Sequence, residues 1–278
     1  MSPRSRDQVA ACQQRLAEVL RGYPGLAVAF SGGVDSSVLL AMAKEVLKDQ
    51  VIALTAESEV HPTGEREAAV AIAQQLKVRH ILFRSDELAD PQFVSNPKDR
   101  CYHCKKRLIT AMRPQSAVLG FEILAHGANL DDCSDYRPGL KAAEELGVVS
   151  PLVQAGLTKA DIRALAKQLG LPNWDRPAMA CLATRIPYGV SIERKVLQQI
   201  DQAETFLRRM GIDHCRVRHH GELARIEVEA RQIERLSKAR LRRRIVDELR
   251  SLGYAHVCID LEGYATGKMN RGVVTQAK

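Results

Sequence analysis

The sequence predicts an α/β fold, a doubly wound parallel sheet followed by a smaller C-terminal α+β domain. Short apolar runs alternate with helical patterns from residue 26 to residue 172, which is typical of parallel strands joined by crossover helices. The Gly- and Ser-rich turn SGGVDSS, residues 31–37, separates the first strand from its helix. After residue 192 the pattern changes to a helix, a hairpin, a basic helix and a last strand.

The elements of the first domain follow from apolar runs and helical periodicity. Residues 1–20 have the pattern of an amphipathic helix. The strands are expected at 26–30, 51–56, 80–84 and 121–129, and the helices between and after them at 36–48, 63–77, 135–147 and 157–172. Thr158 and Asp161 stand three residues apart at the start of the last of these helices, as in a capping box.

The second domain follows a long loop. Residues 173–191 contain prolines and show little periodicity, and loops of that length inside compact domains are usually functional or disordered. Beyond it the pattern predicts a helix at 193–211, a hairpin at 214–229, a basic helix at 234–250 and a strand at 256–267. We therefore expect one domain over residues 1–186 and a second over residues 187–278.

Composition restricts the partners. The formal net charge of +8 favours anionic partners such as nucleotides, although much of the excess lies at 234–250, where interleaved acidic residues favour a solvated helix face. Only 4% of residues are aromatic, which argues against a nucleic-acid partner. The sequence has neither a run of 18 apolar residues nor the apolar core of a signal peptide, so we expect a cytoplasmic protein with no membrane partner.

The turn SGGVDSS is suited to holding an anion. Successive backbone N–H groups in a Gly-rich turn form a concave anion site, and the start of the following helix adds a partial positive charge. Gly32 and Gly33 allow a close approach of the backbone, and Ser31, Ser36 and Ser37 add hydroxyl donors.

Asp35 in the same turn indicates a metal ion. A carboxylate beside a bound anion is unfavourable unless a cation bridges the two, so Mg²⁺ is implied. The turn also lacks the lysine of the GxxxxGK[ST] motif, and it therefore need not hold a γ-phosphate for transfer.

SGGVDSS resembles the pyrophosphate loop of the PP-loop superfamily, whose members split ATP into AMP and pyrophosphate and adenylate an oxygen of the substrate. The stretches GANLDD (127–132), WDRPAMACLATRIPYG (174–189) and EGYATGKMN (262–270) resemble the LarE family of ATP-dependent sacrificial sulfur transferases, and the resemblance runs from about residue 10 to residue 270. It implies ATP contacts and a magnesium site at the following positions: Ser31, Gly32, Gly33, Asp35, Ser36, Ser37, Ala56 and Gly127 for ATP, and Asp35 and Asp132 for Mg²⁺.

The resemblance implies a reaction and a role for each domain. Members of the family adenylate the carboxylates of pyridinium-3,5-biscarboxylic acid mononucleotide and convert them to thiocarboxylates, on the way to the nickel-pincer cofactor of lactate racemase. The first domain would be the ATP pyrophosphatase, and the second would bind the mononucleotide or form a homo-oligomer. Cys181 matches the cysteine that gives up its sulfur in some members and becomes dehydroalanine.

Cys101 and Cys104 form a CxxC, in RCYHCKK, that needs a separate account. From the residues alone, a structural thiol pair, a zinc site completed by His103 or Cys181, and an iron–sulfur cluster held by Cys101, Cys104 and Cys181 all stay open. The resemblance favours a [4Fe–4S] cluster, because a subset of LarE-like proteins is understood to carry one on three cysteines. An open iron would deliver sulfur; without a cluster, Cys181 itself would attack the adenylate.

Charged residues of the second half are candidates for binding and catalysis. Guanidinium groups suit the phosphate and carboxylates of the mononucleotide, which makes Arg185, Arg216 and Arg218 candidate substrate ligands, with surface charge as the other interpretation. Glu204 and Glu227 match acidic positions near the site in the family, and surface salt bridges are the alternative. Tyr102, inside the CxxC, is expected either to stack on a substrate ring or to pack against the protein.

Three other functions compete with sulfur transfer to a mononucleotide. A tRNA thiolation enzyme of the same superfamily would fit the positive charge, but no separate RNA-binding module is evident. A synthetase of the NAD or GMP type would leave Cys181 without a role. A non-catalytic nucleotide-binding regulator would bind ATP without releasing pyrophosphate.

Overall fold

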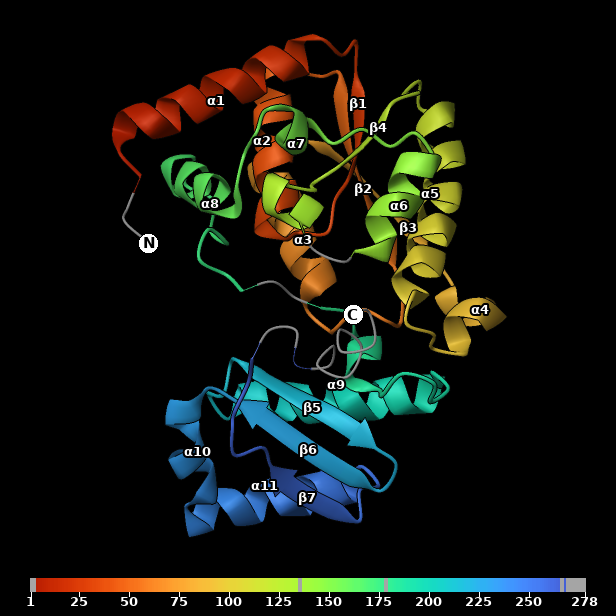
Figure 1. Ribbon diagram of the computed structural model, residues 1–278, viewed down its shortest axis with the longest axis vertical. Coiled ribbons are helices and arrows are strands. Elements are labelled where there is room, and N and C mark those ends of the chain that lie inside the picture. The colour runs from red at the N-terminus through yellow and green to blue at the C-terminus, as the bar shows by residue number, and fades with distance from the viewer. Residues whose placement is uncertain (1–3, 135–136, 178–179, 266–267, 269–278) are drawn as a thin grey trace. The chain divides into compact units, whose positions relative to one another are not determined.

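A computed structural model describes residues 4–134, 137–177, 180–265 and 268 (Figure 1). The chain forms two compact units, each built from several segments. Unit 1 comprises Met1–Ser58, Gly64–Asp86 and Asp99–Met179, and unit 2 comprises Glu59–Thr63, Glu87–Lys98 and Ala180–Lys278. The expected domain boundary between residues 186 and 187 lies within the last segment of unit 2 and stays a prediction.

Unit 1 contains a parallel four-stranded sheet in the order β3-β2-β1-β4. Its strands are β1 (Leu26–Ala29), β2 (Val51–Glu57), β3 (Arg79–Arg84) and β4 (Leu124–His126). Ala29 at the end of β1 pairs with Leu54 on one side and with His126 on the other. The chain thus builds outward from β1 to β3 and then returns to the opposite side with β4. The point where the strand order reverses lies between β1 and β4, and open α/β sheets bind ligands at such a point.

Helices cover both faces of this sheet (Figure 1). They are α1 (Arg6–Arg21), α2 (Val34–Leu47), α3 (Glu65–Gln75), α5 (Arg100–Val118), α6 (Pro138–Glu145), α7 (Pro151–Gln154) and α8 (Lys159–Gln168). Because side chains of a strand point alternately to its two faces, Leu26 and Val28 pack against α1, α2 and α8, while Ala27 packs with residues of α5 and α6. The predicted doubly wound α/β fold is confirmed.

Helix α5 is the main element of unit 1 that the sequence pattern did not predict. It carries the CxxC in its first turn and includes Pro114 in its interior. Proline inside a helix removes a hydrogen bond and usually ends or kinks the helix, so the pattern gave no continuous helical signal.

The expected capping box at the start of α8 is present. The Thr158 hydroxyl accepts from the Asp161 N–H, and the Asp161 carboxylate accepts from the Thr158 N–H.

Unit 2 contains a three-stranded sheet in the order β5-β6-β7. β5 (Cys215–His220) and β6 (Leu223–Val228) form the predicted hairpin, and β7 (His256–Ile259) runs parallel to β6. Its helical elements are η1 (Glu87–Ala89), α4 (Pro91–Val94), η3 (Leu182–Arg185), α9 (Arg194–Arg209), α10 (Ala230–Ser237) and α11 (Ala239–Ser251). This small mixed sheet with helices confirms the α+β character that the sequence predicted.

The two faces of this sheet differ in chemistry. Val217 and Ile226 lie on one face, in a core with the buried side of α9 and α11. The intervening residues lie on the other face and are mostly charged: Arg216, Arg218, Arg225 and Glu227. Apolar residues therefore alternate with charged ones along β5 and β6, although Arg216, Arg218 and Glu227 are themselves buried.

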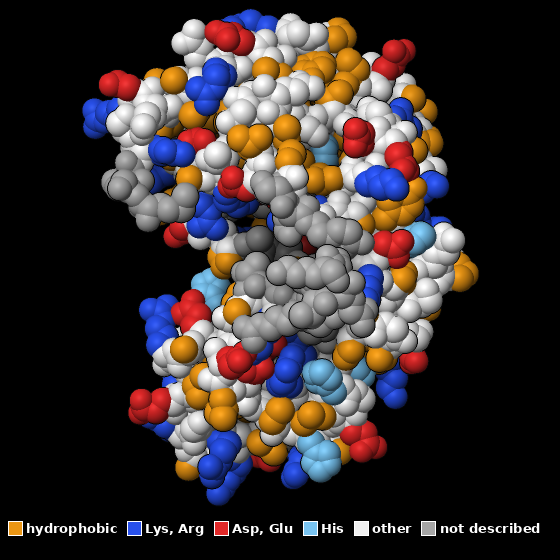
Figure 2. All heavy atoms as spheres, viewed as in Figure 1, with side chains coloured by type: hydrophobic (Ala, Val, Ile, Leu, Met, Phe, Trp, Pro, Cys, Tyr) orange, Lys and Arg blue, Asp and Glu red, His pale blue; other side chains and the backbone are white. Residues whose placement is uncertain are grey.

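The basic segment folds differently from the expectation of one helix. α10 and α11 meet at Lys238, whose backbone is extended with ψ of 132°, so the basic segment is two helices rather than one. α11 buries Ile245 and Leu249 and exposes its arginines, as a solvated helix face does. On the face shown in Figure 2, Lys and Arg side chains are interspersed with Asp and Glu. No helix of the described part of the chain combines the length and the apolar character that a membrane span requires.

Candidate functional site

The loop after β1 has the geometry of an anion site. Gly32 has a φ of +72°, which side chains disfavour, and Gly33 is extended with α2 starting at the next residue. The Ser36 hydroxyl lies 3.2 Å from the Ser31 hydroxyl and donates to the Gly33 carbonyl at 3.1 Å. Ser31 and Gly33 are exposed. The first N–H groups of α2, which have no partner within the helix, are therefore presented beside an open, hydroxyl-lined turn.

Gly127 closes this loop from the side of β4. An added Cβ would lie 2.7 Å from the Ser36 nitrogen and 3.1 Å from the Asp35 carbonyl carbon, so the β4 backbone packs directly on the first turn of α2. Ala56 is the penultimate residue of the adjacent strand, β2, and is 9% exposed. The structure thus brings Gly127 to the switch point beside the loop. His126, the residue before Gly127, ends β4. Burial and the nearby Lys105 cation lower the pKa of His126 to about 3, so this imidazole is neutral near pH 7.

Replacing Gly127 by alanine should disrupt the loop. The contacting atoms belong to the backbone, so the first turn of α2 must shift, at a cost of about 1–3 kcal/mol in the free energy of unfolding. Misplacing the loop by about 1 Å should lower ATP-dependent pyrophosphate release on the order of 10²-fold. Gly22→Ala is the matched control, since Gly22 has an ordinary φ of −72° at the end of α1. Equal release by the Gly127→Ala variant and the unaltered chain would contradict the assignment of this loop.

Asp35 is held by two residues that the sequence did not single out. Lys159, the first residue of α8, forms an ion pair with its carboxylate, and the Asn129 amide approaches it at 3.4 Å. Lys159 thus brings to the loop a positive charge that the turn itself lacks. The capping box indicated where α8 begins, but no pattern indicated that Lys159 meets a residue so distant in sequence.

The neighbouring carboxylates Asp131 and Asp132 have different partners. Asp131 accepts from the Lys159 N–H at 2.9 Å and so caps α8. Asp132 accepts from the Asn129 N–H at 3.0 Å and forms an ion pair with Arg137 at 2.9 Å. Asn129 therefore links the carboxylates of Asp35 and Asp132. Asp132, the residue expected to contact Mg²⁺, is the one of the two that does not cap α8.

Ser37 and Asn173 form a buried contact behind the loop. Ser37 is fully buried, and its hydroxyl lies 3.0 Å from the side-chain nitrogen of Asn173. The same nitrogen donates to the Gly32 carbonyl at 2.8 Å. Ser37 therefore faces the protein rather than the open side of the turn, and its expected contact with ATP stays a prediction. The sequence reasoning gave Asn173 no role.

The CxxC lies at the start of α5. Cys101 and Cys104 are one helical turn apart, so they share a face of the helix; Cys101 is exposed and Cys104 half-buried. Tyr102 donates its hydroxyl to Glu145 of α6 at 2.6 Å, and this hydrogen bond raises the pKa of Tyr102. None of the seven cysteines is in a disulfide. No group of three or more His, Cys, Asp or Glu side chains gathers closely enough to hold a metal ion within residues 4–134, 137–177, 180–265 and 268.

In unit 2, Arg185 fixes the backbone around Cys181. One nitrogen of its fully buried guanidinium donates to the carbonyls of Ala180 and Cys181, at 2.6 and 3.0 Å. The other two nitrogens bind both oxygens of Glu204, at 2.8 and 2.9 Å. Burial raises the pKa of the Glu204 carboxyl, but the Arg185 cation outweighs that effect and holds this pKa below its usual value. Glu204 is thus an anion that orients Arg185, and Arg185 in turn holds the backbone around Cys181. The interpretation of Glu204 as part of a surface salt bridge is wrong, because both side chains are buried.

A second buried pair lies beside the first. Arg218 donates to Glu227 at 2.7 and 3.0 Å and to the Thr184 carbonyl at 2.8 Å. Glu227 is fully buried, so its pair with Arg218 also differs from a surface salt bridge.

Cys215 lies next to Glu204 in the same buried region. Burial raises the pKa of the Cys215 thiol to about 12, which keeps this thiol protonated.

Arg216 differs from Arg185 and Arg218 because, among the described residues, no carboxylate binds it. It is 8% exposed, donates to the Cys215 carbonyl at 2.8 Å, and lies over the Tyr264 ring at 5.2 Å. Burial lowers its pKa, and so does the neighbouring Arg185 cation. In the part of the chain that the structure describes, no ion pair of Arg216 occurs. A buried cation in this state is suited to binding an anionic ligand.

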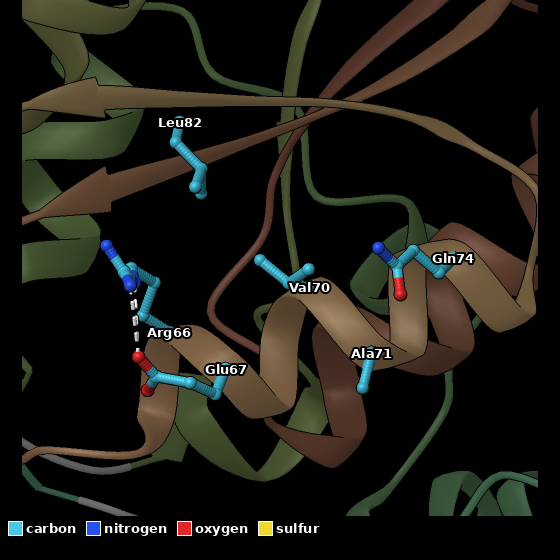
Figure 3. A pocket seen from close by; sticks show the side chains of 6 residues that line it. All are labelled: Arg66, Glu67, Val70, Ala71, Gln74 and Leu82. Carbon is cyan, nitrogen blue, oxygen red and sulfur yellow. Dashed lines mark hydrogen bonds and ion pairs between the residues drawn. The ribbon is translucent and has the colours of Figure 1, made fainter.

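A groove of about 310 Å³ lies elsewhere on unit 1, between α3 and β3 (Figure 3). Val70 and Leu82 face it from the helix and the strand, and an ion pair between Arg66 and Glu67 borders one end. None of the predicted site residues lines this groove, and it has no part in the site described above.

Comparisons with known proteins show which proteins this chain resembles. A family model described as asparagine synthase matches residues 13–110, which include the loop after β1. A protein of Synechocystis sp. described as uncharacterised is 41% identical over 88% of this chain and 91% of its own length. The glutamine-hydrolysing GMP synthase of Aeropyrum pernix is 26% identical over 65% of this chain and 38% of its own length.

A further relative identifies the family. The pyridinium-3,5-bisthiocarboxylic acid mononucleotide synthase of Lactiplantibacillus plantarum is 37% identical over 94% of this chain and 95% of its own length. The match covers both units, including the loop after β1 and the segment with Cys181. Together with the anion loop at the switch point of a parallel sheet, it shows that this chain belongs to the LarE family of PP-loop, ATP-dependent sulfur-inserting synthases, as its motifs predicted.

Proposed function

We propose that this protein converts pyridinium-3,5-biscarboxylic acid mononucleotide into its thiocarboxylate form, with ATP split into AMP and pyrophosphate. The observation that carries the proposal is the loop after β1, where Gly32, Gly33 and the first turn of α2 present N–H groups at the switch point. The name of the Lactiplantibacillus plantarum relative supports the choice of substrate and product.

The first step would be adenylation of a substrate carboxylate. A carboxylate oxygen attacks the α-phosphorus of ATP, and the bond from that phosphorus to the pyrophosphate oxygen breaks. The N–H donors of the loop and the Lys159 cation would stabilise the charge that develops on the departing pyrophosphate. Asp35 and Asp132 fit a magnesium ion, because Mg²⁺ takes one or two carboxylates and completes its shell with phosphates and water. When bound, the ion would neutralise charge on the pyrophosphate.

The second step would place sulfur on the activated carbon. In the sacrificial route, the Cys181 thiolate attacks the carbonyl carbon and AMP leaves, which forms a thioester. Removal of the proton on the Cys181 Cα then breaks the Cβ–S bond, so that the substrate keeps the sulfur and the residue becomes dehydroalanine. Arg185 would hold the backbone of Cys181 in place during both reactions.

The cluster route needs three cysteines. Cys101 and Cys104 share the first turn of α5 and suit two positions of a cluster, and Cys181 is the third ligand that the family resemblance implies. When bound, a [4Fe–4S] cluster with an open iron would supply a hydrosulfide from an external donor to the adenylate. The CxxC is the reason that we favour this route, and both routes use Cys181.

The charged face of the unit 2 sheet would bind the mononucleotide. Arg216 is the candidate for its phosphate or carboxylate, because it is buried and no carboxylate of the described residues binds it. Arg185 and Arg218 already bind Glu204 and Glu227, so we propose that they orient the site rather than hold the substrate directly. Tyr102, whose hydroxyl binds Glu145, would contact substrate only through its ring.

The experiment incubates anaerobically purified, iron-replete protein with ATP, Mg²⁺ and the mononucleotide. Pyrophosphate release and a thiocarboxylate product, detected by mass spectrometry, are the expected results. Loss of one H₂S from the mass of the protein indicates the sacrificial route, whereas brown colour that Cys101→Ala removes indicates the cluster. ATP binding without pyrophosphate release would contradict the proposal and favour a regulatory protein.

A further inference from the structure

We propose that Asn173 is a positioning residue of the pyrophosphate loop, one that fixes the orientation of the Gly32–Gly33 peptide. The inference rests on the proposed function, since it assumes that this loop binds the pyrophosphate part of ATP. Asn173 lies on the segment that follows α8 and is 3% exposed. Its side-chain nitrogen donates to the Gly32 carbonyl at 2.8 Å and lies 3.0 Å from the Ser37 hydroxyl.

The contact with Gly32 settles which atom of the Asn173 amide faces the loop. A carbonyl oxygen can only accept a hydrogen bond, so the atom beside it is the NH₂ group. This group has two hydrogens: one is directed at Gly32, and the other is available to the Ser37 oxygen. The amide oxygen is left buried, with no hydrogen-bond partner among the described residues. A buried acceptor in that state is unfavourable, which indicates that Asn173 occupies this position for its donors.

The bond to Gly32 controls a donor on the opposite side of the same peptide. The C=O of Gly32 and the N–H of Gly33 belong to one trans peptide plane, so they point in opposite directions. With the carbonyl held toward Asn173, the Gly33 N–H points into the turn, where it makes a long contact of 3.3 Å with the Ser31 hydroxyl. That N–H is therefore available to an anion that enters the turn.

Without Asn173 the peptide has little to hold its direction. Glycine populates positive and negative φ about equally, so a peptide between two glycines turns over more readily than any other. A reversed Gly32–Gly33 peptide would present a carbonyl oxygen to the anion in place of an N–H. Asn173 thus selects the orientation that binds pyrophosphate, and its contact with Ser37 ties the same segment to the first turn of α2.

The test compares two ligands on three variants by isothermal titration calorimetry, with Mg²⁺ present. Inorganic pyrophosphate probes the loop, and AMP probes the nucleotide contacts elsewhere. Asn173→Ala and Asn173→Leu both remove the donors, and leucine keeps the branched heavy-atom arrangement of asparagine. We expect both variants to bind pyrophosphate about 10-fold more weakly, because a buried hydrogen bond to the backbone is lost, and to bind AMP within about 2-fold of the unaltered chain. Ser37→Ala, which keeps the Gly32 contact, should change pyrophosphate affinity about 2-fold.

The outcomes separate the inference from its alternatives. If Asn173→Leu keeps full pyrophosphate affinity, the residue acts by filling space and the inference is wrong. Equal losses for AMP and pyrophosphate indicate general damage to unit 1 and also contradict it. A Ser37→Ala variant as weak as Asn173→Ala would show that the effect runs through α2 rather than Gly32. Failure of the unaltered chain to bind pyrophosphate or ATP would instead contradict the proposed function, and the inference with it.

Discussion

Replacing Cys181 by serine should abolish thiocarboxylate formation and leave the first release of pyrophosphate intact. A serine hydroxyl offers no sulfur and is neither a thiolate nucleophile nor a good cluster ligand, so both routes fail. Adenylation uses the loop after β1 and Lys159, which this substitution does not touch. We expect product formation to fall at least on the order of 10³-fold, as it does for other essential nucleophiles. Single-turnover measurements of pyrophosphate and thiocarboxylate on the same sample check both halves of the prediction.

Cys258→Ser is the control for Cys181→Ser. Cys258 is a half-buried thiol on β7 with no role in the proposed reaction. Product formation should therefore stay within about 2-fold of that of the unaltered chain, as is usual for a change away from the site. Thiocarboxylate that accumulates at the normal rate in the Cys181→Ser variant would show that the sulfur reaches the substrate without residue 181.

Replacing Glu204 by glutamine should destabilise unit 2 by about 3–5 kcal/mol, because it leaves the Arg185 charge buried without a partner. Both residues are fully buried, and the carboxylate also accepts from the Val217 N–H at 3.0 Å. Glutamine retains one acceptor and turns its NH₂ group toward donors. Hydrogen–deuterium exchange of the β5 amides, read against urea concentration, measures the change within unit 2.

The effect of Glu204→Gln on the free energy of unfolding should depend on pH. The Arg185 cation lowers the pKa of folded Glu204, so this group stabilises the fold above the pKa of an unfolded glutamate, about 4.3. That contribution is lost as the pH falls through the lower, folded pKa. The difference in unfolding free energy between the unaltered chain and Glu204→Gln should therefore shrink on acidification below pH 4. Glu229→Gln, which removes the half-buried partner of the exposed Arg231, should change the free energy by less than about 0.5 kcal/mol at any pH. A difference that grows on acidification would contradict the assignment.

Local patterns in the sequence predicted the fold and the loop because their signals are contiguous. SGGVDSS lies between an apolar run and a helical pattern, and parallel topology then places Gly127 beside it. The partners of the loop did not follow, since Lys159 and Asn173 reach it from segments more than a hundred residues away. Their positions depend on how α8 packs on α2, which periodicity does not specify.

Sequence patterns also could not predict how the charged residues of unit 2 pair with one another. The sequence suggested Arg185, Glu204, Arg218 and Glu227 as site residues, but charge and spacing could not show which pairs form. Cross-strand register places Arg216 opposite Glu227, yet the buried partner of Glu227 is Arg218. The choice depends on the three-dimensional path of the long side chains around η3, where the Thr184 carbonyl accepts from the remaining nitrogen of Arg218.

The protonated state of Cys215 has a practical consequence for redox chemistry. A thiol with a pKa of about 12, buried among core residues, reacts extremely slowly with iodoacetamide near neutral pH. Short alkylation of the native protein should therefore mark the exposed Cys101 in preference to this core residue. Peptide mapping after such a pulse would follow the oxidation of the CxxC with Cys215 as an internal unlabelled reference.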